Sequence, residues 1–276
     1  MILEDREGTA KCLIDPINGL LSKSDLFRLY RAKSLDESQS YLLRIPSDAS
    51  GNGRMNYEAS TLSRLKEISD RTEVEFAEQR KDPDARVHYD WLMPVLVDSF
   101  ISSEDQGYRQ MNLLSIVDGN IEDYVPLSKL IESYKIDVKS AAWVLGRFFK
   151  LQSFLEMCDC PLQFRADQVI LDPQMHRVVY LDWSSAKGCS WGENIRREAE
   201  LVLEWIKDGG TEHEDEFRSM LAYLADPQNV ASLNGASAHA LLYRNIDSWW
   251  GHKYHPFTYS DRKTGVWHQV QNAPIC

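Results

Sequence analysis

The sequence predicts an α+β fold in which the strands come first and the helices follow. Residues 25–33 alternate between apolar and polar side chains, and residues 41–45 form a second apolar run after a polar turn. Residues 92–100 and 110–117 form another pair of apolar runs, separated by an acidic turn. Farther along, most clearly over residues 138–158, apolar residues recur at helical spacing instead. The expected architecture is therefore an antiparallel sheet followed by a helical part.

The overall charge limits the classes of partner. The 276-residue chain carries a formal net charge of −11, whereas neutralising a phosphate backbone requires a basic surface. No apolar run reaches membrane-spanning length, and residues 1–5 lack the cationic and apolar pattern of a signal segment. We therefore expect a cytoplasmic protein that binds neither a membrane nor nucleic acid.

The cysteines do not predict a disulfide framework, because there are five of them without regular spacing. Cys158 and Cys160, with Cys189 downstream, are compatible with a zinc site, but no histidine or further cysteine stands at supporting spacing. We favour the interpretation that they are small buried residues.

The first part of the chain predicts one helix among the strands. Residues 1–19 show little pattern, and we interpret them as an arm that leads into the sheet. Residues 48–56 predict a loop, and apolar residues at helical spacing then predict a helix over 57–69, with Glu58 in its first turn. The polar residues 70–88 predict either an exposed connection or an extension of that helix.

A hairpin is predicted in the second part of the chain. The apolar and β-branched runs 169–171 and 178–181 flank a polar turn over 172–177 that begins with Asp-Pro. Asp182 follows the second strand directly, so a rigid element holds its carboxylate. Such a carboxylate is either a ligand for a phosphate-bound cation or a cap on the following turn.

This arrangement resembles the centre of a protein kinase, where a catalytic loop leads into a hairpin and an Asp-Phe-Gly turn closes it by holding magnesium. Asp182-Trp183-Ser184 stands at the place of Asp-Phe-Gly. Gln168 stands at the place of the metal-binding Asn, and Gln163 at the place of the catalytic Asp. An amide cannot accept a proton near neutral pH and is a poor magnesium ligand. The resemblance is therefore to a degenerate kinase.

The resemblance also implies a nucleotide site in the first part of the chain. Arg44 stands at the position of the strand lysine, and Glu58 at that of its helical partner, so the two form a candidate ion pair. The alternative is that Glu58 only complements the helix N-terminus. Residues 20–27, at the place of the phosphate-covering loop, contain no glycine. Backbone groups near Val117 would meet an adenine.

The implied fold has two lobes, with residues 1–117 as an N-lobe of antiparallel sheet and one helix, and residues 118–276 as a mainly helical C-lobe. Only residues 186–193 separate the Asp182 turn from the next predicted helix, so the activation segment is shortened and the usual platform for a peptide substrate is missing. The helices predicted in the C-lobe are 127–134, 138–158, 194–207, 217–224 and 237–249.

The resemblance thus implies a pseudokinase, a regulatory module that binds a protein partner and binds ATP and Mg²⁺ weakly or not at all. One alternative is a purely structural component with an inactive cleft. The other is an active phosphotransferase or nucleotide transferase with relocated acidic groups. In that case Asp182 would hold the metal, and Asp159 or Asp167 would act as the base.

Overall fold

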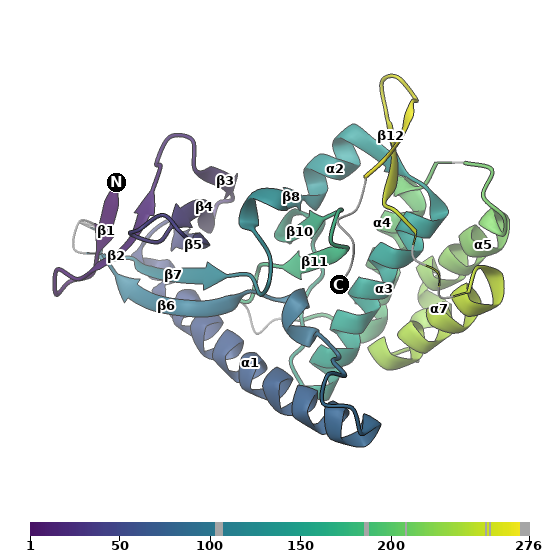
Figure 1. The fold of residues 1–276 in the computed structure, drawn as a ribbon, viewed down its shortest axis with the longest axis horizontal. Helices are drawn as coiled ribbons and strands as arrows, with labels where there is room; N and C mark the ends of the chain where they lie inside the picture. The colour runs from purple at the N-terminus through teal and green to yellow at the C-terminus, as the bar shows by residue number, and fades with distance from the viewer. Residues whose placement is uncertain (103–106, 185–187, 208, 252, 254, 271–276) are drawn as a thin grey trace. The chain divides into compact units, whose positions relative to one another are not determined.

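The computed structural model describes residues 1–102, 107–184, 188–207, 209–251, 253 and 255–270 (Figure 1). The chain divides into two compact units. The first unit consists of Met1–Asp123 with Leu181–Ser185, and the second of Tyr124–Tyr180 with Ala186–Cys276. The short segment after the predicted hairpin, which contains Asp182, therefore belongs to the first unit.

The first unit contains an antiparallel sheet, which has seven strands within the described residues and follows the order β1-β2-β4-β5-β7-β6, with β3 paired to β4. Its strands are β1 (Ile2–Glu4), β2 (Ala10–Ile14), β3 (Leu20–Lys23), β4 (Phe27–Lys33), β5 (Ser40–Pro46), β6 (Val95–Ile101) and β7 (Gln110–Ser115). The predicted strands over residues 25–33 and 41–45 are confirmed by the antiparallel pair β4 and β5. The predicted second hairpin is confirmed by β6 and β7.

The N-terminal residues are part of this sheet, so the expectation of an arm over residues 1–19 is wrong. β1 pairs with β2, and the Met1 amino group donates a hydrogen bond to the Ile14 carbonyl at 2.8 Å. These strands have only three and five residues, which is too few for an alternating pattern to be recognised. Leu3 and Cys12 are nevertheless buried in the core of the sheet.

Strand β5 shows how the two faces of the sheet are used. Leu43 and Ile45 pack into a hydrophobic core with residues of the neighbouring strands. Leu42 and Arg44 alternate with them and therefore point to the opposite face. Helix α1 (Asn52–Arg80) packs along β6 and β7 (Figure 1). The alternation thus places a charged residue of the central strand on the face that α1 covers.

Helix α1 is longer than the sequence predicts. A short 3-10 turn, η1 (Ala49–Gly51), precedes it, so the loop expected over residues 48–56 is largely helical. Glu58 consequently lies in the second turn and not in the first. Of the two alternatives for residues 70–88, the extension of the helix is correct as far as Arg80. Its last turns are polar and exposed, so no apolar stripe marks them in the sequence.

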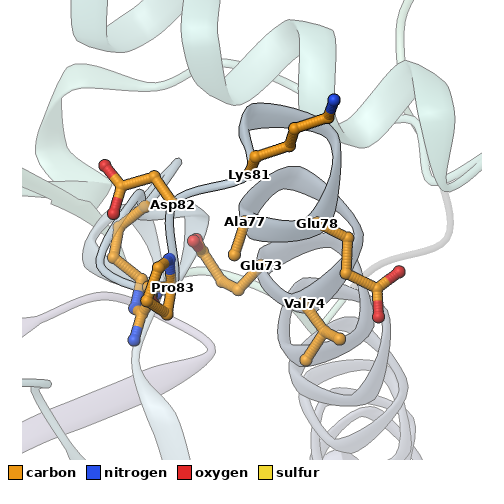
Figure 2. Close-up of a pocket in the computed structure, with 8 residues that line it drawn as sticks. Glu73, Val74, Ala77, Glu78, Lys81, Asp82 and Pro83 are labelled. Carbon is orange, nitrogen blue, oxygen red and sulfur yellow. The ribbon is translucent and has the colours of Figure 1, made fainter.

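The C-terminal end of α1 and the connection after it enclose a hollow of about 510 Å³ (Figure 2). Both charges and apolar groups line it, namely Glu73, Val74, Ala77, Glu78, Lys81, Asp82, Pro83 and Arg86. The Glu73 carboxylate accepts hydrogen bonds from the backbone N–H groups of Val87 and His88, at 2.7 and 2.5 Å. This carboxylate therefore anchors the connection to the helix, which is a structural role.

The second unit is mainly helical. Its helices within the described residues are α2 (Leu127–Ser133), α3 (Val138–Met157), α4 (Trp191–Trp205), α5 (Glu214–Ala225), α6 (Pro227–Val230) and α7 (Gly235–Trp249). Helices α2, α3, α4, α5 and α7 confirm the helices predicted over residues 127–134, 138–158, 194–207, 217–224 and 237–249. No helix among the described residues is long and apolar enough to cross a bilayer.

Two small sheets complete the second unit, each with three strands within the described residues. The first has the order β11-β10-β8 and the second β13-β12-β9. Their strands are β8 (Val125–Pro126), β9 (Tyr134–Ile136), β10 (Val169–Asp172), β11 (Arg177–Tyr180), β12 (Thr258–Asp261) and β13 (Trp267–Gln269). Strands β10 and β11 confirm the predicted hairpin, whereas β12 and β13 lie beyond the elements that the sequence predicts.

Candidate functional site

Arg44 is the centre of a buried polar cluster in the first unit. Its side chain is only 4% exposed. One guanidinium nitrogen, Nη1, donates to Glu58 Oε1 at 2.6 Å and to the Leu181 carbonyl at 2.6 Å. The other, Nη2, donates to Asp182 Oδ1 at 2.8 Å. The predicted Arg44–Glu58 ion pair is therefore confirmed, and Arg44 also binds a second carboxylate.

Glu58 is fully buried and accepts hydrogen bonds with both carboxylate oxygens. Oε2 receives one from Asn112 Nδ2 at 3.0 Å, while Oε1 also receives a longer one, 3.4 Å, from the Trp183 backbone. Burial raises the pKa of Glu58, and the attraction of Arg44 opposes that rise. The alternative that Glu58 only complements a helix terminus does not account for these contacts.

Asn112 of β7 is a member of the cluster that the sequence analysis missed. It is fully buried, and its Nδ2 also donates to the Met55 carbonyl at 3.0 Å. Its Oδ1 accepts a hydrogen bond from Ser99 Oγ at 2.6 Å. An amide inside an apolar strand was the available signal, because a buried polar side chain needs partners.

Asp182 lies at the edge of the cluster, with 16% of its side chain exposed. Its Oδ1 also accepts hydrogen bonds from the Ser184 backbone N–H at 3.1 Å and from Ser184 Oγ at 2.6 Å. Burial opposes ionisation, but Arg44 and Ser184 outweigh it and hold the pKa of Asp182 below its usual value. The carboxylate therefore caps its own turn, as one sequence interpretation expects; its role as a metal ligand stays a prediction.

Phe27 covers one face of the guanidinium. It begins β4, is buried, and its ring centroid lies 4.2 Å from Arg44 Cζ. A cation over an aromatic face is stabilised by the ring quadrupole. We call Arg44, Glu58, Asn112, Asp182 and Phe27 the Arg44 cluster.

The predicted catalytic-loop residues lie in the second unit. The loop around Gln163 is fixed by Asn194 of α4, which donates to the Leu162 carbonyl at 2.5 Å and accepts from the Phe164 N–H at 2.8 Å. Tyr180 Oη donates to the Gln163 carbonyl at 2.8 Å. The Gln163 side chain itself is exposed. The backbone of this loop is thus held firmly, while its central side chain faces solvent.

The remaining polar residues of this loop have local partners. Gln168, in the 3-10 turn η4 (Ala166–Gln168), donates through Nε2 to Asp167 Oδ2 at 3.1 Å. The same Asp167 forms an exposed ion pair with Arg165 at 2.7 Å. Asp159 adopts a left-handed backbone conformation, with φ of 46°. Neither aspartate shows the buried setting that would tune a carboxylate as a general base.

The structure brings Arg44, Glu58 and Asp182 together within the first unit, whereas Gln163 and Gln168 belong to the second. Val117 lies in a turn after β7. Among the described residues, no three His, Cys, Asp or Glu side chains group so as to hold a metal ion. Cys158 and Cys160 are buried, as the interpretation as small core residues expects. Cys189 contacts Asn194 Oδ1 at 2.8 Å.

Comparison with known proteins identifies the fold. No family model matches the sequence, and no curated protein matches it. The structure of Rad53 1–466 in complex with AMP-PNP matches with a TM-score of 0.53 at 10% sequence identity, over 83% of this chain and 64% of that one. The fold is protein-kinase-like. The chain thus spans less than two thirds of the Rad53 structure, and at this identity the likeness concerns the fold alone.

Two structures of the PknI kinase domain from Mycobacterium tuberculosis are also similar. Each has a TM-score of 0.48 at 9% identity, and the matches cover 82% and 84% of this chain and 93% and 94% of theirs. The α+β class expected from the sequence, an N-terminal antiparallel sheet followed by helices, is confirmed by the elements of the structure and by the match to Rad53.

Proposed function

We propose that the chain is a pseudokinase, a regulatory module that acts through a protein partner and transfers no phosphate. The observation that carries this proposal is the double engagement of Arg44 by Glu58 and Asp182. In a protein kinase, the corresponding strand cation serves the ATP phosphates and the corresponding aspartate holds magnesium. Here the cation and the aspartate satisfy each other.

The chemistry of arginine supports this proposal. A lysine ammonium is a compact point charge on a flexible stem, but the guanidinium is a planar fork whose donors point in fixed directions. Both terminal nitrogens of Arg44 bind groups of the first unit, and Phe27 covers one face. Turning Arg44 toward a phosphate would leave Glu58 buried without its cation, which is strongly unfavourable.

The groups missing from the sequence support the same conclusion. Transfer of a phosphoryl group depends almost entirely on positioning and on electrostatic stabilisation by metal and basic groups. Gln163 and Gln168 supply neither a proton acceptor nor a charged metal ligand. The segment 20–27 contains no glycine and includes strand β3 instead of an open loop. We expect these changes together to lower transfer by many orders of magnitude.

The similar structure of Rad53 contains AMP-PNP, which makes nucleotide binding by this chain plausible. We expect weak binding or none, with Asp182 as the metal ligand and the backbone near Val117 at the adenine. The regulatory role implies a protein partner, and we expect the chain to act in the cytoplasm. The negative charge of the chain argues against nucleic acid.

The test is a combined transfer and binding assay with the full chain. We expect no incorporation of labelled γ-phosphate into the chain or into added peptides, and at most a small rise in melting temperature with ATP and Mg²⁺. Asp182→Asn removes the candidate metal ligand, and the exposed Asp84→Asn is the matched control. Incorporation that disappears in Asp182→Asn and persists in Asp84→Asn would refute the proposal. Loss in Asp159→Asn or Asp167→Asn would then identify the base of an active phosphotransferase.

A further inference from the structure

The second unit contains a cavity that is lined by basic and aromatic side chains. It lies among α3, the turn between β10 and β11, α7 and the segment after α7, and its volume is about 430 Å³. Sites for small molecules typically have volumes of about 300–1,000 Å³. Lys139, Arg147 and Lys253 line it with two histidines, and none of its described lining residues is a carboxylate. In a chain with a net charge of −11, a cavity whose charged lining residues are all cations needs an explanation.

Arg147 is a charged residue of the cavity that lacks a partner within the described part of the chain. It lies on α3, its Nε atom is buried, and no acceptor within the described part of the chain bonds to that atom. No carboxylate of the described residues forms an ion pair with its guanidinium. Burial and the nearby Arg177 lower the pKa of Arg147, although Tyr243 opposes the change. A buried charge without a counter-ion is costly, so it is normally paired.

Burial and nearby positive charges also lower the pKa values of two histidines close to Arg147. Burial and Arg147 lower the pKa of His176 to about 4, with a further contribution from His255. Burial, Lys150 and Arg147 also lower the pKa of His239 to about 4. Asp137 accepts a hydrogen bond from the lining residue His255 at 2.8 Å and forms no ion pair with Arg147 among the described residues.

Aromatic rings form the other walls of the cavity. The rings of Trp143 and His176 lie 4.5 Å apart, and the Lys139 ammonium lies 5.9 Å from the Trp250 ring. Tyr243 of α7 packs onto α3 at Gly146, where a Cβ atom would lie 3.2 Å from the Tyr243 oxygen. Helices α3 and α7 lie side by side (Figure 1). The cavity thus joins a cationic centre to planar apolar surfaces.

We propose that this cavity binds a small phosphomonoester, whose phosphate pairs with Arg147 and Lys139 and whose organic part packs against Trp143 and Trp250. A planar guanidinium fork matches the geometry of phosphate oxygens, and charge-assisted pairs of this kind are the strong ones. A dianion also neutralises two cations, whereas a carboxylate neutralises one. The site lies wholly within the second unit and does not depend on whether the chain transfers phosphate.

The test measures the binding of phenyl phosphate to the full chain by isothermal titration calorimetry. The titration is done at constant ionic strength in a buffer without phosphate. We expect saturable binding, weaker binding of inorganic phosphate because it lacks the ring, and still weaker binding of benzoate. Arg147→Met should weaken the binding of phenyl phosphate at least about tenfold, since it removes a charge-assisted pair. The matched control is Arg244→Met on α7, an exposed arginine outside the cavity, which should leave the affinity unchanged.

Lys139→Met is a second variant, at a half-buried position, and should weaken the binding of phenyl phosphate several-fold. It keeps the proposal testable if Arg147→Met does not fold. The absence of saturable heat with the unmodified chain would overturn the proposal. Equal affinities of the unmodified chain and Arg147→Met would do the same. Binding of benzoate as tight as that of phenyl phosphate would overturn the assignment to a phosphomonoester.

Discussion

Arg44 in the first unit is buried, and Arg147 in the second is partly buried with a buried Nε atom, but the two arginines have opposite surroundings. Arg44 lies between the carboxylates of Glu58 and Asp182. Arg147 has Arg177 and neutral rings as its neighbours and no described carboxylate partner. The comparison teaches that burial alone does not define the role of a charge. A charge that the fold compensates is structural, whereas an uncompensated one is available to a ligand.

The two units also differ in whether a buried carboxylate has a cation as its partner. Glu58 is paired with Arg44, whereas Glu198 on α4 is buried with Gln152 as its hydrogen-bond partner, at 2.8 Å. Among the described residues, nothing bonds to the second oxygen of Glu198. Burial raises the pKa of Glu198 to about 8. Burial without a cation therefore favours the neutral form of Glu198, whereas Glu58 has Arg44 as its partner.

The largest expected effect is the difference in stability between the two variants in which either arginine is exchanged for methionine. Arg44→Met leaves Glu58 buried without a cation and should lower the free energy of unfolding by about 3–5 kcal/mol. Arg147→Met removes a charge that has no partner and should leave the free energy of unfolding unchanged or raise it by about 1 kcal/mol. Urea unfolding of both variants, in a buffer without phosphate, measures the contrast.

A double substitution sharpens this contrast. If the cost of Arg44→Met comes from the unpaired acid, Glu58→Gln in the same chain should recover part of the lost stability, because the amide carries no charge. An Arg147→Met variant as unstable as Arg44→Met would mean that Arg147 is also compensated within the fold. The comparison of the two arginines would then be wrong.

The second expected effect is a dependence of stability on pH, caused by Glu198. Its carboxyl has a pKa of about 8 in the folded chain and about 4.3 in the unfolded chain, so the folded chain binds the additional proton between these values. Stability should therefore fall as the pH rises, by about 2 kcal/mol between pH 6.5 and 8. Denaturant unfolding at both pH values measures this change, and Glu198→Gln should abolish it.

Two partly buried histidines, His176 and His239, cannot cause the fall in stability between pH 6.5 and 8. His176 and His239 have pKa values of about 4 in the folded chain, against an ordinary value of 6.5. Their effect on stability therefore lies between these values and has the opposite sign, with stability rising as the pH rises. A Glu198→Gln variant that keeps the fall above pH 6.5 would show that another group causes it.

Much of the fold could be predicted because its elements carry periodic patterns. The β4–β5 and β6–β7 pairs, the β10–β11 hairpin and the long helix α3 all have enough apolar residues to show their period. β1 and β2 are too short for this, and β12 and β13 follow an aromatic tail whose pattern does not indicate strands. The second half of α1 is mostly polar and largely exposed, so only its first half was recognisable.

Part of the candidate site, the Arg44–Glu58 pair, could be predicted from the resemblance to kinases and not from a periodic pattern. Arg44 and Glu58 are separated by 14 positions, and their pairing follows from the order strand, loop and helix that the kinase resemblance supplies. The contact of Arg44 with Asp182 spans 138 positions and depends on the path of the whole chain. Phe27 is one apolar residue of an alternating strand, and the amide of Asn112 inside an apolar strand was a signal that did not name its partners. Arg147 was missed because a charged residue within an amphipathic helix ordinarily faces solvent.

The smallest expected effect concerns the ring that covers Arg44. Phe27→Leu keeps an apolar side chain but removes the aromatic face, and should lower the free energy of unfolding by about 1 kcal/mol. A double-mutant cycle with Arg44→Met separates the two contributions, because the loss of apolar volume persists without the cation and the attraction to the ring does not. We expect Phe27→Leu to cost about 0.5 kcal/mol less when Arg44 is absent. Equal costs in both backgrounds would mean that Phe27 only fills space, and the Arg44 cluster would then be held by its carboxylates and Asn112 alone.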